Sequence, residues 1–389
     1  MNFFKEKLQT IKDKDEYRDF RVLESFQNTI VSYKNKEFHL MGSNNYLSLN
    51  NNKQLNKMAK EVVDAFGTGA GGSRLTTGTS FWHEKLEDKL TKSKNTESSL
   101  VFGSGYMANL GAISGLTDKT WTIFSDKYNH ASIVDGINLS GAKLLRYNHR
   151  DINHLKRRLR NCLSKNKMII TDSVFSMDGT IAPIAALIEL SNEFDCILVV
   201  DDAHGFGVLG ENGMGISEYL KLGHEIDLTI GSFSKAVPSS GGYVTGKNYL
   251  VEIVKNQARS FIYSTALPPH IMAINYKAIE IIESEKYRRI ELRDKVNYFI
   301  EKLRENGINI ENSITPIIPI IIGDSKITMK IQSELLKDNI FIPGVRPPSV
   351  PIGSSRLRAS VNLNHKYKDL EYIASKIGQS YRKFKVGEF

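Results

Sequence analysis

Short apolar runs that alternate with helical patterns occupy the middle of the chain. Between the runs lie segments of about 10–15 residues in which apolar positions recur at helical spacing. The runs fall at residues 99–102, 121–124, 143–147, 168–171, 196–200, 227–230 and 242–245. Because strands separated by helices pair side by side in one direction, this alternation predicts an α/β fold with a mostly parallel central sheet flanked by helices.

The N-terminal segment has a different pattern. It begins with an amphipathic helical stretch and continues with two extended segments at 30–33 and 37–41. These segments flank the polar turn 34–36, which predicts a pair of strands joined by a tight connection. We assign residues 1–48 to this N-terminal helix and strand segment.

The pattern changes again in the last third of the chain. A long charged helical stretch runs from about Ile271 to Asn306. Further apolar runs follow at residues 317–322, 340–342 and 356–361. We therefore predict a large α/β domain at 49–285 and a smaller C-terminal α+β domain at 286–389.

Composition and charge narrow the class of protein. The chain has 389 residues, of which 41% are apolar and 24% charged, as in ordinary soluble globular proteins. Its net charge of +9 comes from scattered basic residues with small clusters such as 156–158 and 286–289. Most of these side chains are expected on solvated helix faces, with a mild attraction for phosphates, coenzyme A or an acidic carrier protein. No basic block or basic-aromatic stripe indicates a nucleic-acid partner.

The cysteine content and the N-terminal residues indicate the cellular compartment of the protein. The chain has two cysteines and no CxxC motif, so no disulfide framework is expected. Charged residues begin at Lys5, and no apolar stretch reaches the roughly 18 residues of a membrane span. We expect a cytoplasmic protein without a membrane segment.

Lys235 is the first candidate for chemistry. It lies on the small-residue turn 231–235, directly after the apolar run at 227–230, and an earlier buried strand leads into Asp201 and His204. A lysine amine can form a Schiff base with the aldehyde of pyridoxal phosphate (PLP), and a carboxylate can keep the pyridine nitrogen protonated. All three residues follow strand ends, where parallel sheets bind their ligands.

Three further residues follow strand ends in the same way. Gly105 lies where the run at 99–102 gives way to a helix, a place suited to a phosphate, although a plain strand-to-helix turn has the same pattern. His130 offers a flat imidazole that can stack on a cofactor ring, although a lone loop histidine more often serves packing. Ser176 offers a hydroxyl group toward the ring.

Several loops have compositions typical of binding sites. The glycine-dense loop 67–74 runs into a helical pattern, so we expect it to line a site instead of serving as a flexible linker. Segments 259–269 and 346–351 each contain a rigid Pro-Pro pair. Arg356 and Arg358 lie on one face of a predicted strand, and one of them can form a bidentate pair with a substrate carboxylate.

Taken in order, these motifs resemble the α-oxoamine synthases, fold-type-I PLP enzymes that join an amino acid to an acyl thioester. The likeness covers nearly the whole chain. It is carried by the segments 43–47, 71–75, 82–87, 105–109, 129–132, 175–179, 201–205, 234–236 and 346–351. The stretches 175–183 and 346–351 look most like the branch of the family that makes 8-amino-7-oxononanoate for biotin.

The resemblance implies roles for the matched residues. The implied catalytic residues are Lys235, His130, Asp201 and His204. The implied cofactor-binding residues are Gly105, Tyr106, His130, Ser176, Asp201, His204, Ser232, Lys235 and, from the second subunit of a homodimer, Ser264 and Thr265. The implied substrate-binding residues are Arg18, Asn44, Ser73, His130, Ser349 and Arg358. The chain departs from the family at Ser234, often glycine, and at Val237-Pro238, which leaves the shape of the lysine loop open.

The implied reaction is an acyl transfer. L-Alanine and a pimeloyl thioester, carried by coenzyme A or acyl carrier protein, would give 8-amino-7-oxononanoate, CO2 and a free thiol. Ser73, where relatives that use glycine tend to have threonine, would leave room for the alanine methyl group, a discrimination of about 1–3 kcal/mol. The alternatives are another α-oxoamine synthase, such as glycine C-acetyltransferase or serine palmitoyltransferase, and a non-catalytic binding protein on the same fold.

Overall fold

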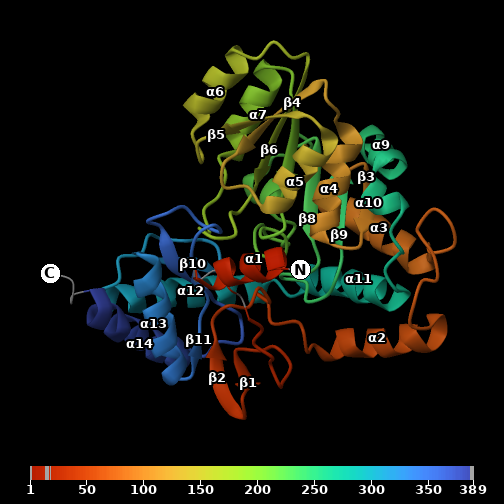
Figure 1. Ribbon diagram of the computed structural model, residues 1–389. Helices are drawn as coiled ribbons and strands as arrows, with labels where there is room; N and C mark the ends of the chain where they lie inside the picture. The colour runs from red at the N-terminus through yellow and green to blue at the C-terminus, as the bar shows by residue number, and fades with distance from the viewer. Residues whose placement is uncertain (1, 14–16, 18, 386–389) are drawn as a thin grey trace.

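The computed structural model describes all residues except 1, 14–16, 18 and 386–389 (Figure 1). A seven-stranded sheet forms its centre. In spatial order its strands are β3 (Ser98–Phe102), β9 (Gly242–Gly246), β8 (Leu228–Ser232), β7 (Ile197–Asp201), β6 (Asn166–Asp172), β4 (Trp121–Asp126) and β5 (Lys143–Tyr147). The strands from β8 to β5 are parallel, and β9 runs antiparallel to β8 and β3. The prediction of a mostly parallel sheet is confirmed, and each predicted run forms a strand.

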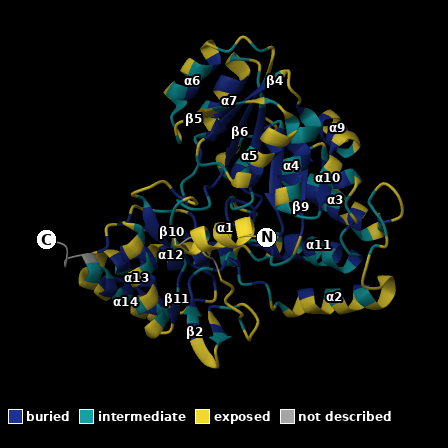
Figure 2. Ribbon diagram, viewed as in Figure 1, coloured by how far each residue is buried: buried dark blue, intermediate teal, exposed yellow. Residues whose placement is uncertain are grey.

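Both faces of this sheet are covered by helices, which explains why its strands are apolar without alternation. In β6, for example, Ile169 packs into one apolar cluster, whereas Met168 and Ile170 pack into the other. The first cluster is completed by α3 (Phe81–Lys94), α6 (Ile152–Arg160), α7 (Ile184–Glu193) and α11 (Pro269–Ser284), and the second by α4 (Gly105–Leu116), α5 (Ala131–Ser140), α9 (Asn248–Gln257) and α10 (Arg259–Ile262). The short α8 (Ile216–Leu220) follows β7. The strands are accordingly the most buried part of the molecule (Figure 2).

A smaller part of the chain lies beside the large sheet, in blue in Figure 1. Its antiparallel sheet has the order β10 (Ile317–Gly323), β13 (Ser355–Ser360) and β12 (Gly344–Val345). Its helices are α12 (Tyr287–Glu305), α13 (Ser325–Lys337) and α14 (Tyr367–Lys385). α12 and α14 pack on each other, and α13 packs on β13.

The helical stretch predicted from Ile271 to Asn306 is present, but it is divided into α11 and α12. The structure has two helices, because the backbone leaves helical geometry at Glu285. No glycine or proline marks this break in the sequence, and both helices have buried apolar faces, so the periodic pattern continues across it. The division of the chain into domains at 285/286 stays a prediction.

The N-terminal hairpin joins the C-terminal part of the chain. β1 (Ile30–Tyr33) pairs antiparallel with β2 (Lys36–Leu40), and β2 pairs in parallel with β11 (Ile340–Phe341). Lys34 and Asn35 form the tight turn, with φ of 52° and 57°, which matches the twist of a two-residue hairpin. The predicted pair of strands is present.

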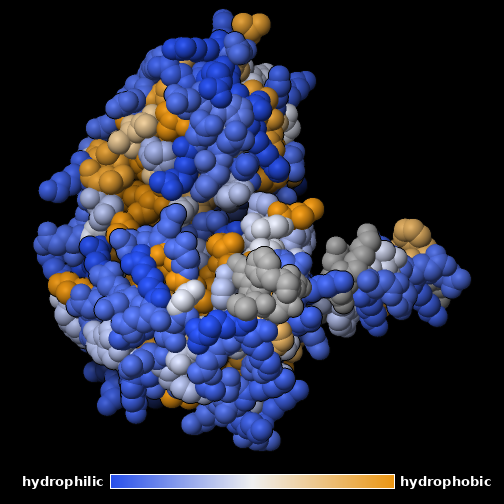
Figure 3. Space-filling model, turned by 90° about the vertical axis from the view of Figure 1, so that its left-hand side faces the viewer, coloured by the Kyte–Doolittle hydropathy of each residue, from blue (hydrophilic) through white to orange (hydrophobic). Residues whose placement is uncertain are grey.

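Two helices of the N-terminal region lie at the edge of the molecule. α1 (Asn2–Asp13) has no buried residue and projects from the body (Figures 2 and 3). α2 (Lys53–Phe66) packs along α11. Among the described residues, no helix has both the length and the apolar composition that crossing a bilayer requires.

Candidate active site

A cavity of about 230 Å³ lies at the carboxyl ends of β6, β7 and β8. It is lined by Ser104, Gly105, Tyr106, Asn109, His130, Ser132, Asp172, Ser176, Asp201, Ala203, His204, Ser232, Ser234 and Lys235. Eight of these residues were singled out from the sequence. They come from separate segments of the chain and meet because the strands that precede them end at the same edge of the sheet.

Asp201 is the buried carboxylate of the cavity. It ends β7 with 6% of its surface exposed. Its Oδ2 accepts a 2.6 Å hydrogen bond from Nδ2 of Asn109, and its Oδ1 accepts one of 3.0 Å from the backbone N–H of Ala203. Burial raises the pKa of Asp201, and these hydrogen bonds oppose that rise because they favour the charged form. Asn109 lies in a recognised motif, but its role was missed.

Asp172 is a second buried carboxyl group in the cavity, and the sequence interpretation did not include it. It ends β6 and stands directly opposite Asp201 in the parallel pair. Its Oδ2 accepts a 2.9 Å hydrogen bond from the backbone N–H of His130, the residue that precedes α5. Burial, followed by the charge of Asp201, raises the pKa of Asp172 well above its ordinary value. Its position at a strand end is the one signal that could have identified it.

Lys235 lies in the loop after β8. Burial lowers the pKa of its amine, the Arg358 guanidinium lowers it further, and the Asp201 carboxylate opposes both effects. Next to it, the hydroxyl groups of Ser232 and Ser234 lie 2.8 Å apart, and the backbone N–H of Ser234 donates to Oγ of Ser232. The unusual Ser234 therefore helps to close the turn that presents Lys235.

A chain of hydrogen bonds leads from His204 to the smaller part of the molecule. Nδ1 of His204 and the hydroxyl of Tyr46 are 2.8 Å apart, and the same hydroxyl donates to Oδ1 of Asn44 at 3.1 Å. Nη2 of Arg358 donates to that oxygen of Asn44, also at 3.1 Å. Burial, followed by the charges of Lys235 and Arg358, holds the pKa of His204 well below its ordinary value, so the imidazole stays neutral. Tyr46 is a functional candidate that the sequence interpretation missed.

Two arginines of β13 hold the turn that carries Ser176. Nε of Arg358 donates to the backbone carbonyl of Ser176 at 2.5 Å, and Nη1 of Arg356 forms an ion pair with Asp178 at the same distance. Both arginines are buried. Because residues two apart on a strand share a face, β13 can present both guanidinium groups to one turn.

Six of the predicted site residues that the structure describes do not line this cavity, namely Asn44, Ser73, Ser264, Thr265, Ser349 and Arg358. Ser264 and Thr265 border a narrow crevice beside His83, and Thr265 forms an isolated β-bridge with Ser73. The glycine-dense loop that carries Ser73 therefore does not line the Lys235 cavity of its own chain. Ser349 lines a different pocket, and Arg18 lies outside the described residues.

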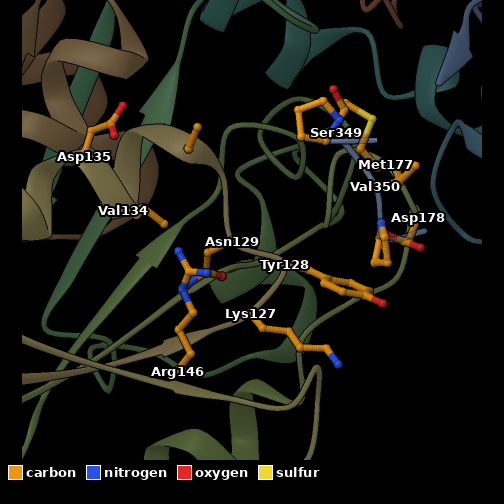
Figure 4. Close-up of a pocket in the computed structure, with 13 residues that line it drawn as sticks. Lys127, Tyr128, Asn129, Val134, Asp135, Arg146, Met177, Asp178, Ser349 and Val350 are labelled. Carbon is orange, nitrogen blue, oxygen red and sulfur yellow. The ribbon is translucent and has the colours of Figure 1, made fainter. Parts of the chain in front are cut away.

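That second pocket adjoins the cavity and has a volume of about 620 Å³. Asn129 and Ala131, which flank His130, lie on one of its walls, and Met177, the neighbour of Ser176, lies on another. Figure 4 shows Val134 and Asp135 on one side, and Met177, Ser349 and Val350 on the other. Lys127 and Arg146 bring two cationic side chains to the same pocket.

Comparison with known proteins gives a consistent result. The sequence profile of the family described as aminotransferase class I and II matches residues 36–377. An 8-amino-7-oxononanoate synthase of Lysinibacillus sphaericus is 44% identical over 379 residues, which is 96% of each chain. A serine palmitoyltransferase from S. paucimobilis with a bound PLP–myriocin aldimine superimposes with a TM-score of 0.92 at 28% identity, over 97% of this chain and 96% of that one. The 8-amino-7-oxononanoate synthase of Francisella tularensis has a TM-score of 0.78 at 27% identity, over 89% and 98%.

The chain therefore belongs to the class I and II aminotransferase family, with the fold of the fold-type-I PLP transferases. The predicted fold class and the resemblance to the α-oxoamine synthases are both confirmed. Within that group, its sequence is similar over almost its full length to 8-amino-7-oxononanoate synthases.

Proposed function

We propose that this protein is a PLP-dependent acyltransferase of biotin synthesis. It condenses L-alanine with a pimeloyl thioester and yields 8-amino-7-oxononanoate, CO2 and a free thiol. The observation that carries the proposal is one cavity that joins a buried carboxylate, Asp201, to a lysine of lowered pKa, Lys235. This cavity occurs in a chain 44% identical to an 8-amino-7-oxononanoate synthase.

The cavity fits a planar ring that bears a phosphate. Gly105 opens α4, whose first backbone N–H groups have no partners within the helix and can bind an anion. A Cβ atom at Gly105 would lie 3.0 Å from Cβ of Ser232, so a side chain there would fill the space between α4 and β8. We assign the phosphate to Gly105, Tyr106 and Ser232, and the ring to His130, Ser176, Asp201 and His204.

Bound PLP supplies an electron sink for the negative charge that develops at Cα of the amino acid. Asp201 would hold the proton of the pyridine nitrogen, because hydrogen bonds from Asn109 and Ala203 favour its charged form. His204 stays neutral and can hydrogen-bond the ring hydroxyl without adding a charge.

Lys235 has two tasks in this proposal. Its Nζ would hold the cofactor covalently at rest, and the amine released when alanine binds would remove the proton from Cα. A general base works best with a pKa near the operating pH, and burial lowers the pKa of Lys235 in that direction.

Arg358 and Asn44 are assigned to the amino acid. Arg358 has no carboxylate partner among the described residues, and its Nη2 donates to the neutral oxygen of Asn44. A substrate carboxylate would be a stronger acceptor for that group. We assign Ser73 to the side-chain methyl group of alanine.

The acyl thioester is assigned to the second pocket. Met177, Val350 and neighbouring prolines give it apolar walls for an acyl chain, and Ser349 lies beside them. Lys127 and Arg146 have no ion pair among the described residues and can attract the phosphate of a carrier. Arg18 stays a predicted acyl-substrate residue. Coenzyme A and acyl carrier protein both remain candidate carriers.

We further propose a homodimer with shared active sites. Tyr263 is 71% exposed and adjoins Ser264 and Thr265, and Tyr106 at the cavity is 43% exposed. α1 also projects from the body with Phe3 and Phe4 exposed (Figure 3). Tyrosine and phenylalanine side chains are enriched at protein interfaces. Because Ser73 and Thr265 are bridged, we assign both, with Ser264, to the cavity of the second subunit.

We place the protein in the cytoplasm. Both cysteines, Cys162 and Cys196, are free thiols in the structure. Unpaired cysteines are typical of reducing compartments.

The decisive test incubates the purified protein with L-alanine and either pimeloyl-CoA or the pimeloyl carrier protein. The release of thiol and of CO2 is measured. Lys235→Ala should lower turnover by about 10³-fold or more and remove the visible absorbance that borohydride abolishes in the wild type. Lys255→Ala, on the exposed face of α9, is the matched control. Full activity of Lys235→Ala would contradict the assignment.

A second candidate function is that of a related synthase, because the serine palmitoyltransferase fold matches with a TM-score of 0.92. Assays that pair serine with palmitoyl-CoA, and glycine with acetyl-CoA, separate these activities. A clear preference for either pair over alanine and pimeloyl thioester would replace our proposal.

A further inference from the structure

A second acidic residue lies immediately behind Asp201. Asp202 points to the opposite side of β7 and forms an ion pair with Lys94, the last residue of α3, at 3.1 Å. The side chain of Asp202 is completely buried, and that of Lys94 is 3% exposed. Neither residue has a role in the mechanism described above. Burying two charges costs free energy unless their attraction and hydrogen bonds offset the loss of water, so the pair calls for an explanation.

The backbone is built around the Asp202 carboxylate. Its Oδ1 accepts a 2.7 Å hydrogen bond from the hydroxyl of Ser173, and both of its oxygens lie within 3.3 Å of the backbone nitrogen of Ile216. A Cβ atom at Gly205 would lie 2.1 Å from Oδ1, and one at Gly215 would lie 1.8 Å from Oδ2. Both glycines are therefore required for this carboxylate to fit.

The Lys94 ammonium is equally well surrounded. It donates to the backbone carbonyl of Met214 at 2.8 Å in addition to Asp202. It also lies 5.0 Å from the ring centre of Phe206 and 5.6 Å from that of Tyr243, within the range of cation–π attraction. These partners of Lys94 therefore lie behind Asp201, the carboxylate assigned to the cofactor.

This pair affects the electrostatics of Asp201. Burial is the main cause that raises the pKa of Asp201, and the charge of Asp202 raises it further. Both effects favour a neutral acid, which cannot hold a protonated pyridine nitrogen as an ion pair. In a buried environment an uncompensated negative charge on the adjacent residue acts strongly, because little water screens it. The cation of Lys94 offsets that charge.

We propose that Lys94 is a positioning residue that acts through Asp202 to keep Asp201 ionised beneath the cofactor. The inference rests on the proposed PLP function of the cavity. Lys94 touches neither substrate nor cofactor, and its contribution is the neutralisation of a buried charge. A purely structural pair would also recover its stability when both charges are removed. The pH dependence of PLP binding separates the two roles, because it changes only if the protonation of Asp201 changes.

The test measures the PLP dissociation constant of the full-length chain by absorbance titration at several pH values, and Lys94→Met should shift the pH dependence of binding relative to the wild type. Lys94→Met leaves Asp202 uncompensated and should weaken PLP binding at least tenfold. The double variant Lys94→Met/Asp202→Asn removes both charges and should return to within about threefold of the wild type, because the charge imbalance is gone. Lys89→Met, which breaks the more exposed Lys89–Glu283 ion pair of the same helix, should bind PLP like the wild type.

Two results would overturn the proposal. One is wild-type affinity in Lys94→Met, and the other is a double variant that binds as weakly as the single variant. If Lys94→Met is insoluble, Lys94→Gln is used in its place, because it keeps a donor for the carbonyl of Met214. It should weaken PLP binding to the same extent. Failure of the wild type to bind PLP would instead refute the proposed function, so the two failures are distinguishable.

Discussion

At the scale of single residues, the cavity is organised around opposing effects on one carboxylate. Burial and the neighbouring charge of Asp202 raise the pKa of Asp201 and so favour its neutral form. The amide of Asn109 and the backbone N–H of Ala203 favour its anion. These hydrogen bonds are therefore what opposes neutralisation of the buried Asp201, and each donor can be tested by substitution.

Asn109→Ala should therefore weaken cofactor binding. The substitution removes a hydrogen bond to a charged acceptor, so we expect the PLP dissociation constant to rise by about 10-fold or more. Absorbance titration of the purified variant measures the change. Asn138→Ala, on the exposed face of α5, should have no effect, and an unchanged affinity in Asn109→Ala would show that Asn109 does not support Asp201.

At the scale of single elements, the start of α3 depends on a neutral histidine. The backbone N–H of Ser80 donates to Nδ1 of His83 at 3.1 Å, in a capping box at the helix N-terminus. Burial, followed by the charge of Arg74, lowers the pKa of His83 to about 4. The imidazole can accept this hydrogen bond only while Nδ1 is unprotonated, so the cap is sensitive to acid.

This cap predicts a pH dependence of stability. The folded pKa of His83 lies below its unfolded value, so its contribution is complete above pH 6.5 and is lost as the pH falls toward 4. Over that range the free energy of unfolding should fall by about 2–3 kcal/mol through this residue. His83→Gln keeps a capping-box side chain but does not titrate, so it should lose less stability in acid.

Urea unfolding of both proteins at several pH values measures the difference. The exposed His224→Gln is the control and should follow the wild type. Identical pH profiles for His83→Gln and the wild type would contradict the assignment of acid sensitivity to the α3 cap.

At the scale of the whole molecule, the site lies where separate parts of the chain meet. β13 of the smaller part presents Arg356 and Arg358 to the turn after β6. Asn44, which follows the N-terminal hairpin, completes the contact with Arg358. Ser73 and Thr265 lie together but do not line the cavity of their own chain, which supports a site completed by a second copy.

A mixing experiment tests this sharing. Lys235→Ala lacks the reactive amine, and Thr265→Asp would place a negative charge beside the cofactor phosphate, so each variant alone should be inactive. If Thr265 serves the second subunit, a hybrid dimer contains one intact site. Random mixing of equal amounts should then recover about a quarter of wild-type activity, because half of the dimers are hybrids with one working site.

No recovery in the mixture would place Thr265 in the site of its own chain. Sedimentation of each variant alone is the control, because both must form dimers for the mixture to be informative.

The local pattern of apolar and polar residues alone predicted the strands of the large sheet and several residues of the site. The apolar runs specify the strands of the large sheet, since a strand buried on both faces needs a continuous apolar segment. Lys235, Asp201, His204 and His130 were recognisable because each follows such a strand, and the edge of a parallel sheet brings strand ends together.

The tertiary structure decided what depends on contacts between distant positions. Lys94 and Asp202 are 108 positions apart, and no local pattern indicates that they pair. The break at Glu285 likewise follows from packing, with no glycine or proline in the sequence to mark it. The sequence by itself therefore determined the elements and the reactive groups, whereas folding determined which charges surround them, because burial and neighbouring charge exist only once distant segments meet.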